Sequence, residues 1–237
     1  MRAQRRPAGP RLEVVPQSRG SRRVAERTAA NSAERPTANN AKGTQTRARL
    51  LLAAKAVFED KGYESARISD FTAKAGISHG SFYHYFPTKE AAFLQLVEDL
   101  DTHLGEPLDS VIFRADSTLP PAERIRAGIG EHLRTYQQEA QFLRVIEEYS
   151  GYDEKFAARR FDQRRSSMQS VIASIEQLQR RGLADPDLDA RVTIPALCEM
   201  INGLANAWLV RQRLALSLDH AVDQLATLWA NTLGLTR

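Results

Sequence analysis

Apolar residues recur at helical spacing along most of the chain, and this pattern predicts an all-α protein. The first clear example is TQTRARLLLAAKAVFEDKGY, in which five apolar residues follow the spacing of one helix face: Leu50, Leu51, Ala54, Val57 and Phe58. A helix is therefore expected over residues 44–61. Gly62 follows, and glycine commonly ends a helix because it adopts left-handed backbone angles without strain.

Two shorter helices are predicted next, separated by a turn that contains glycine. In ARISDFTAKAG the residues Ile68, Phe71 and Ala75 share one face, and the segment ends at Gly76. Ser78 then begins a new helix, because a serine hydroxyl at the N-cap accepts from amides two or three residues on. Helix, short helix, turn and second short helix are the plan of a helix-turn-helix, whose second helix enters the major groove of DNA.

Rings occupy five consecutive positions, residues 82–86, within the second short helix. A helix turns about 100° per residue, so five neighbouring side chains cannot all be buried. Phe82, with Tyr85 or Phe86, is expected to pack on the first helix. The opposite face would contact phosphates or base edges, or would simply be solvated. It carries five residues: His79, Gly80, Ser81, Tyr83 and His84.

Helical patterns continue to the C-terminus. Pro87 ends the third helix, because the residue before a proline is pushed out of helical geometry, and Thr88 caps a fourth helix over residues 89–104. Further helices are expected from Pro120–Pro121 to residue 138, over 142–182 with an interruption near Ser150–Gly151, over 192–213 and over 220–234.

Composition fits a globular protein of one or two domains. The chain has 237 residues, of which 42% are hydrophobic and 26% charged, and domains of roughly 100–200 residues are usual. No stretch reaches the roughly 18–20 consecutive apolar residues that a membrane span needs. Cys198 is the single cysteine, which excludes a disulfide framework or a zinc site built from cysteines and suits a reducing cytoplasm.

Positive charge is concentrated toward the N-terminus. Lys and Arg outnumber Asp and Glu by ten to three over residues 1–43 and by seven to five over residues 44–91, whereas residues 92–237 carry sixteen against twenty-one. A basic front and an acidic remainder suggest that only the front approaches a polyanion. Residues 1–43 show no sustained apolar period, so we expect a disordered extension, either a solvated leader or an arm that adds nonspecific attraction to phosphate.

Motifs of enzymes are missing from the sequence. It contains no HExxH, P-loop, CxxC or GxSxG motif, and Gly128–Gly130 is only a fragment of a dinucleotide-binding pattern. The five histidines lack metal-ligand spacing, and His132 and His220 are expected at the surface. We therefore predict a protein without catalytic activity, metal or cofactor.

An ordered set of short motifs extends over the segment from Thr46 to about Leu96. The set comprises Phe58, Lys61–Tyr63, Asp70, Ala75–Ser78, Tyr83–Phe86 and Pro87–Glu90. Each motif is weak alone, but the ordered set with its spacing is specific, and in it the segment resembles the N-terminal domain of the TetR family of bacterial repressors.

The resemblance implies an all-α fold with two functional domains. An N-terminal three-helix DNA-binding domain with a helix-turn-helix would occupy residues 44–91, after the extension 1–43. A fourth helix would join it to a C-terminal helical domain for ligand binding and dimerisation over residues 92–237.

The resemblance also implies which residues contact DNA. Lys89, at the start of the fourth helix, would bind backbone phosphate together with the amides of that helix N-terminus. Thr46 and Arg47 are further candidates for phosphate contact. The recognition surface would consist of Ser78, His79, Gly80, Ser81, Tyr83 and His84.

One position departs from the family pattern. The second helix usually begins with threonine, which caps the helix and touches phosphate, whereas this chain has Ala66 and Arg67 there. We expect Ser65 to take over the capping and Arg67 to supply the phosphate contact by its charge.

In the family the C-terminal domain binds a small effector and forms a two-fold dimer through its last two long helices, which match residues 189–213 and 218–234. A pocket would lie among the middle helices. Its apolar walls favour a lipophilic effector, although the same residues would suit an ordinary core. The candidates are Phe142, Ile146, Tyr149, Tyr152, Phe156, Asn202, Asn206 and Trp208.

Together these observations predict a cytoplasmic transcriptional repressor with no membrane partner. It would bind a near-palindromic double-stranded DNA operator as a homodimer and be released by a small lipophilic effector. The alternative is an architectural DNA-binding protein without response to an effector. The two differ in whether a ligand releases the DNA.

Overall fold

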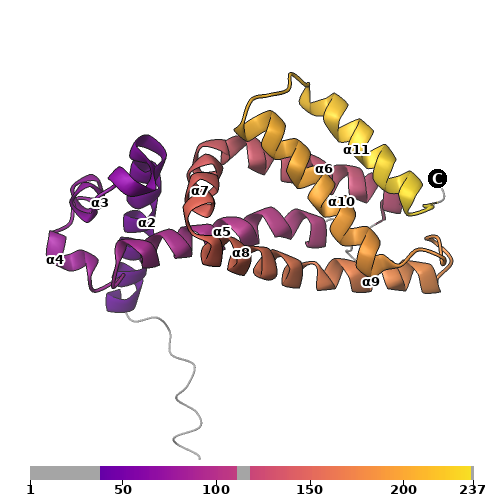
Figure 1. Cartoon of the computed structure of the whole chain (residues 1–237). Coiled ribbons are helices and arrows are strands. Elements are labelled where there is room, and N and C mark those ends of the chain that lie inside the picture. The colour runs from indigo at the N-terminus through magenta and orange to yellow at the C-terminus, as the bar shows by residue number, and fades with distance from the viewer. Residues whose placement is uncertain (1–37, 111–117, 236–237) are drawn as a thin grey trace, which may run out of the picture. The chain divides into compact units, whose positions relative to one another are not determined.

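The computed structural model describes residues 38–110 and 118–235, and all secondary structure in these ranges is helical (Figure 1). The all-α prediction is confirmed for this part of the chain. By compactness the chain divides into two units, residues 1–46 and residues 47–237. Among the described residues, no helix combines the length and apolar character that crossing a membrane requires.

The first described helix, α2 (Ala38–Ser65), begins six residues before the predicted start at Thr44. It includes residues 38–43 of the predicted extension, and the prediction of disorder for residues 1–37 lies outside the described residues. Gly62 interrupts α2 with φ 74° and ψ 171°, a conformation that glycine adopts without steric cost. Regular helix therefore stops where the sequence predicted, and one further turn continues to Ser65.

The start of α3 (Ile68–Ala75) corrects the predicted cap. Arg67, and not Ser65, occupies the N-cap position, and its backbone N–H donates to the Asp70 carboxylate at 3.2 Å. Because an arginine side chain has no acceptor, the carboxylate of Asp70 supplies the side-chain capping. Lys61 lies 3.0 Å from the same carboxylate, and its hydrogen bond holds the pKa of Asp70 below its usual value. Ser65 is still part of α2, so it is too early in the chain to cap α3.

The next two helices surround the predicted recognition segment. α4 (His79–Phe82) is a single helical turn, whereas the sequence predicted helix as far as Phe86. α5 (Lys89–Ser110) follows, and the Thr88 hydroxyl caps it as predicted by accepting from the Ala91 amide at 3.0 Å.

The remaining elements are α6 (Pro121–Gln138), α7 (Ala140–Tyr152), α8 (Glu154–Ser167), α9 (Gln169–Arg180), α10 (Ala190–Ala205), the π-helical turn η1 (Asn206–Val210) and α11 (Leu218–Thr232). The helix predicted over 142–182 is broken at Asp153, close to the predicted interruption, and again at Met168, where no break was predicted. Asp153 caps α8 by accepting from the Phe156 amide at 3.0 Å.

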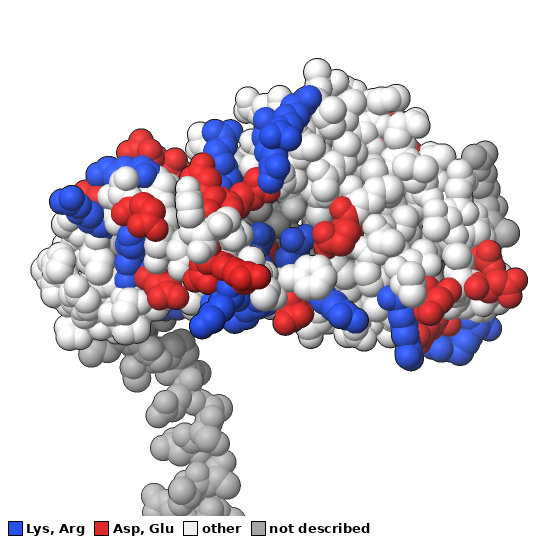
Figure 2. All heavy atoms as spheres, viewed as in Figure 1, with Lys and Arg blue, Asp and Glu red and all other residues white. Residues whose placement is uncertain are grey.

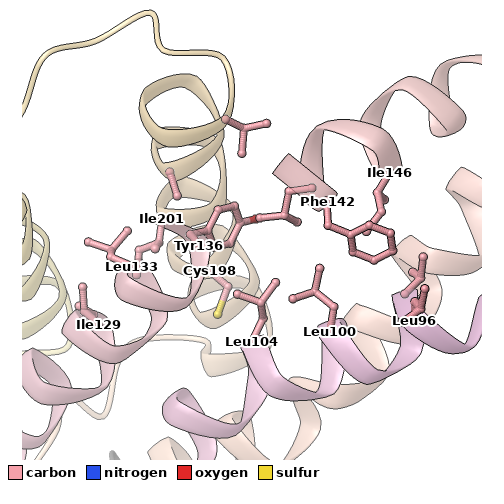
Figure 3. Close-up of a cluster of buried hydrophobic side chains, with 14 of the residues drawn as sticks. Leu96, Leu100, Leu104, Ile129, Leu133, Tyr136, Phe142, Ile146, Cys198 and Ile201 are labelled. Atoms are coloured by element: carbon pink, nitrogen blue, oxygen red, sulfur yellow. The ribbon is translucent and has the colours of Figure 1, made fainter. Parts of the chain in front are cut away.

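One hydrophobic core joins the helices of the unit formed by residues 47–237. Figure 3 shows side chains converging from four helices: Leu96, Leu100 and Leu104 of α5, Ile129, Leu133 and Tyr136 of α6, Phe142 and Ile146 of α7, and Cys198 and Ile201 of α10. α6 packs chiefly against α11 and α5. The predicted boundary at residue 91 falls within α5, so this helix is shared by both predicted domains.

Candidate functional site

The predicted recognition residues lie on a short, capped segment. Ser78 is the N-cap of α4, as predicted, and its hydroxyl accepts from the Ser81 amide at 3.3 Å. After α4 the chain continues in tight turns, because the amides of Tyr85 and Phe86 both donate to the Phe82 carbonyl, at 2.9 and 3.0 Å. The segment is therefore one helical turn prolonged by hydrogen-bonded turns.

Two rings hold this segment on the domain, as the sequence predicted. Phe82 is fully buried and Phe86 is 3% exposed, whereas Tyr85 is only half-buried. The Phe82 ring centroid lies 6.2 Å from that of Phe71 in α3, which lies 5.0 Å from that of Phe58 in α2. The rings thus form a continuous support from α2 through α3 to α4.

The opposite side of the segment is open to solvent. Tyr83 is 52% exposed, His79, Gly80 and His84 are exposed as well, and the centroids of the His79 and Tyr83 rings are 5.6 Å apart. A Cβ atom added at Gly80 would meet nothing within 4 Å, so a ligand can approach this backbone. Residues 76–88 contain no Lys, Arg, Asp or Glu, and Figure 2 shows the resulting uncharged surface where α4 lies.

The predicted phosphate contacts differ in their surroundings. The Arg47 guanidinium donates to Gln95 at 2.8 Å and lies 4.9 Å from the Phe86 ring centroid, so it packs behind the recognition segment. Arg67 is exposed. In the first compact unit, the Thr46 hydroxyl donates to the carbonyl of Lys42 at 2.9 Å. Their contacts with DNA stay predictions.

Lys89 has structural partners within the chain. Its ammonium donates to the carbonyls of Tyr63 and Ala66, at 2.8 and 3.2 Å, and lies 4.4 Å from the Tyr63 ring centroid. A cation at the C-terminal end of a helix stabilises its unpaired carbonyls. Lys89 therefore ties the start of α5 to the end of α2, and its phosphate contact is untested.

An aromatic cluster connects α2 and α5 with α7 and α8. Phe93 of α5 is fully buried, and its ring centroid lies 5.8 Å from Phe142, 5.0 Å from Tyr149 and 5.9 Å from Phe156. Tyr63, from the last turn of α2, contacts Tyr149 in a tilted arrangement with the ring centroids 4.3 Å apart. Three predicted effector-pocket residues, Phe142, Tyr149 and Phe156, thus pack together against the DNA-binding segment.

The other predicted pocket residues are dispersed. Ile146 is fully buried in the core, and Trp208 is 9% exposed in η1, where Asn206 is half-buried. Tyr152 is 83% exposed, because it is the last residue of α7 and the backbone changes direction at the following residue. Asn202 lies elsewhere, in the wall of a cavity. The structure therefore does not bring the eight candidates together around one space.

That cavity, of about 50 Å³, lies where α5, α6, α8, α9 and α10 meet. A space of this size holds a few water molecules or a small chemical group. Its wall contains both polar and apolar residues: Asp101, Leu104, Gly105, His132, Arg164, Met168, Val171, Cys198 and Asn202.

His132 corrects the prediction of a surface histidine, because it is only 3% exposed. Its Nδ1 lies 2.9 Å from the Leu104 carbonyl and its Nε2 lies 3.1 Å from the Asn202 amide. Burial lowers the pKa of His132, so the ring is neutral, and its two nitrogens face two oxygens, the Leu104 carbonyl and the Asn202 Oδ1. His132 thus links α5, α6 and α10. The sequence signal for this burial was that His132 lies on the same helix face as Ile125, Ile129 and Tyr136.

A buried ion pair adjoins the cavity, and the sequence reasoning missed it. Arg160 of α8 donates to both carboxylate oxygens of Asp101 in α5, at 2.7 and 2.9 Å, and the two side chains are 13% and 6% exposed. The charge of Asp101 is therefore satisfied by Arg160. Nothing in the local sequence distinguishes these two residues from solvated helix charges.

Residues 50–96 match the family described as "Bacterial regulatory proteins, tetR family". The chain is 28% identical over 171 residues to the HTH-type transcriptional regulator YdgC of Bacillus subtilis, covering 71% of this chain and 84% of YdgC. It is 26% identical over 204 residues to the HTH-type transcriptional regulator EthR of Mycolicibacterium smegmatis, covering 81% and 87%.

The fold is also that of a solved regulator. The transcriptional regulator FadR from Bacillus subtilis, in complex with stearoyl-CoA, superposes with a TM-score of 0.64 at 15% identity, over 78% of this chain and 98% of that protein. At this identity the likeness concerns the fold. Together with the family match and the helix-turn-helix geometry, these findings show that the chain is a DNA-binding transcriptional regulator of the TetR family of bacterial regulatory proteins.

Proposed function

We propose that this regulator is a repressor that binds a near-palindromic operator as a homodimer and leaves it when a small lipophilic effector binds the C-terminal helices. The observation that carries the DNA-binding part is the division of α4 and its following turns into a buried and an exposed side. Tyr83, His84 and His79 present polar groups outward, and such groups read phosphate oxygens and base edges in the major groove.

Dimerisation is supported by exposed apolar and small residues on α10 and α11. Val192 is 66% and Met200 36% exposed on α10, and Leu228 is 50% exposed on α11. Ala196 and Gly203 are exposed on the same face of α10 and would let another helix approach closely. A two-fold dimer through these helices would present two recognition segments to successive major grooves, about 34–36 Å apart.

The aromatic cluster offers a route from effector to DNA. Phe93 and Tyr63 contact Tyr149 of α7, so a displacement of α7 or α8 would press on α5 and α2. A packed cluster of rings does not compress freely, and the two recognition segments would lose the spacing of the groove. An effector can do this only by binding the DNA-incompetent arrangement more tightly.

A lipophilic effector is supported by the apolar middle helices and by the likeness of the fold to a regulator in complex with stearoyl-CoA. Phe142 and Leu100 also line a groove of about 410 Å³ between α2, α5 and α7, a volume in the range of ligand sites. The groove thus has the volume for an effector, whereas the cavity of about 50 Å³ could hold only a small part of one.

Operator selection from random DNA, followed by titration, tests the proposal. The protein is expected to select a near-palindrome, to bind it as a dimer in light-scattering measurements, and to release it on addition of a fatty acid or acyl-CoA from a panel of chain lengths. An architectural DNA-binding protein would bind without a palindromic preference and would keep its DNA at every ligand concentration.

A further inference from the structure

The recognition segment, residues 76–88, contains no Lys, Arg, Asp or Glu, although it is the part of the chain proposed to lie against DNA. Duplex DNA carries one negative charge per about 1.7 Å of its axis, and proteins usually neutralise its phosphates with Lys and Arg. In this segment only the side chains of His79 and His84 can become positively charged. Any cationic contact made by the segment itself must therefore come from these two imidazoles.

Both imidazoles are open to solvent. His79 is the first residue of α4, and His84 lies in the turn that follows this helix. Both residues are exposed, on the side of the segment that also presents Tyr83. An exposed imidazole gains a proton without the cost of burying a charge, and histidine is the side chain whose charge ordinarily changes between pH 5 and 8. A positive charge can thus form on this face near neutral pH.

Charged side chains on the neighbouring helices have contacts of their own or are exposed. Arg47 of α2 donates to Gln95. Lys89 of α5 donates to carbonyls at the end of α2, and Asp70 of α3 pairs with Lys61. The exposed charged residues of α3 and α5 closest in sequence to the segment are Arg67, Lys74 and Glu90. The paired groups leave the outward face of the segment to the two histidines.

We infer that His79 and His84 contact the phosphates of the operator as imidazolium cations and supply the positive charge of the recognition segment. A neutral imidazole has one N–H donor, whereas the protonated ring has two donors and a full charge. The complex then holds more protons than the free protein and free DNA, so operator affinity increases as the pH falls. The inference rests on the proposed function, because it requires this segment to lie on DNA.

Anisotropy titrations of the full-length protein with its selected operator, at pH 8 and pH 6 and constant ionic strength, test the proton uptake. Binding is expected to be at least about fivefold tighter at pH 6, because a tenfold higher proton affinity of one imidazole in the complex gives about a sixfold change over this range. Protonation of the buried His132 opposes folding, so it cannot produce this increase. Equal affinity at both pH values, or weaker binding at pH 6, would overturn the inference.

Variants identify the groups that take up the protons. The double variant His79→Gln with His84→Gln should lose most of the ratio between the two affinities, and each single variant should keep part of it. The matched control is His103→Gln with His220→Gln, which replaces two histidines that are exposed on other helices and should keep the full ratio. A full ratio in both single variants, or an equal loss in the control, contradicts the assignment. Circular dichroism at both pH values verifies that each variant is folded.

Salt dependence shows whether the added charge meets phosphate. Each neutralised phosphate contributes about 0.9 to the slope of log affinity against log salt concentration, so the wild-type slope should be steeper at pH 6 than at pH 8 by roughly one to two. Equal slopes at the two pH values would refute the phosphate contact.

The same titrations separate this inference from the proposed function. If no operator can be selected from random DNA, the proposed operator binding fails. If an operator is bound with an affinity independent of pH, the proposed function stands and only the role of the two histidines as cations is refuted.

Discussion

Tyr63 and Tyr149 lie in ring contact, with centroids 4.3 Å apart and planes inclined by 51°. Tyr63 belongs to the end of α2, and Tyr149 belongs to α7, more than eighty residues later. The Phe93 ring lies 4.8 Å from Tyr63 and 5.0 Å from Tyr149. The contact therefore connects the helices that support the recognition segment with the first helices of the C-terminal part.

A double-mutant cycle measures this connection. Tyr63→Leu and Tyr149→Leu are each expected to destabilise the protein, with a coupling free energy of about 0.5–1.5 kcal/mol, the usual value for an aromatic pair. Urea unfolding of the wild type, both single variants and the double variant gives the number. The pair Tyr63→Leu and Tyr136→Leu is the control. Tyr136 contacts His132 instead, so these effects should add within about 0.5 kcal/mol.

Tyr83→Ala is expected to reduce operator affinity at least tenfold while changing the free energy of unfolding by no more than about 0.5 kcal/mol, because the ring is 52% exposed. Fluorescence anisotropy with labelled operator and thermal unfolding are the two measurements. Tyr152→Ala removes a tyrosine that is 83% exposed and should leave operator affinity unchanged. Wild-type affinity and salt dependence in Tyr83→Ala would refute the assigned recognition face.

Phe82→Ala is expected to destabilise the protein by about 3–5 kcal/mol, because it empties a fully buried ring position. Phe82 packs between Phe71 and Phe86, so the recognition segment loses its support. Chemical denaturation followed by tyrosine and tryptophan fluorescence reports the loss. Phe161→Ala, at a ring that is 57% exposed, should cost less than 1 kcal/mol. Similar costs for both variants would show that Phe82 is not the anchor.

Asp101→Asn is expected to destabilise the protein by about 3–5 kcal/mol, because Arg160 would keep a buried charge without its partner. Replacing both residues, as Asp101→Leu with Arg160→Leu, removes the charge along with its partner and should cost clearly less. Denaturant unfolding compares the two variants. A double variant as unstable as Asp101→Asn would mean that packing, and not charge, determines the effect.

The buried His132 makes stability depend on pH. Its pKa in the folded protein is lowered from 6.5, chiefly by burial, so below about pH 6.5 the unfolded chain binds a proton that the folded protein does not. The free energy of unfolding should therefore fall as pH decreases from about 7 to about 5. In His132→Gln this part of the dependence should disappear, as measured by urea unfolding at several pH values. His220→Gln, at an exposed histidine, should retain the wild-type dependence.

Local sequence signals determined much of the DNA-binding segment. Gly62 and Gly76 have positive φ values, and Ser78 and Thr88 cap helices. These features were predictable because each depends on the chemistry of one residue and its immediate neighbours. The burial of Phe82 followed from the same local logic, since a helical turn has one inward side.

Features that depend on distant partners could not be predicted in this way. The start of α3 was an exception, because its capping carboxylate, Asp70, lies only three residues after Arg67, so the signal was local although Ser65 was expected to cap the helix. The break at Met168 and the π-helical turn η1 have no distinctive residues. The residues at the early start of α2, from Ala38 onward, likewise show no apolar periodicity that would have predicted a helix there.

The sequence by itself determined the helical class, the helix-turn-helix and the division of its rings into inward and outward faces, because helical periodicity and capping act over a few residues. Only the tertiary structure decided which side chains meet when helices that are distant in the chain pack together. It buried His132 between Leu104 and Asn202, paired Asp101 with Arg160, and placed three predicted pocket residues in an aromatic junction. A residue's role there depends on helices that are far away in the chain, and no local pattern carries that information.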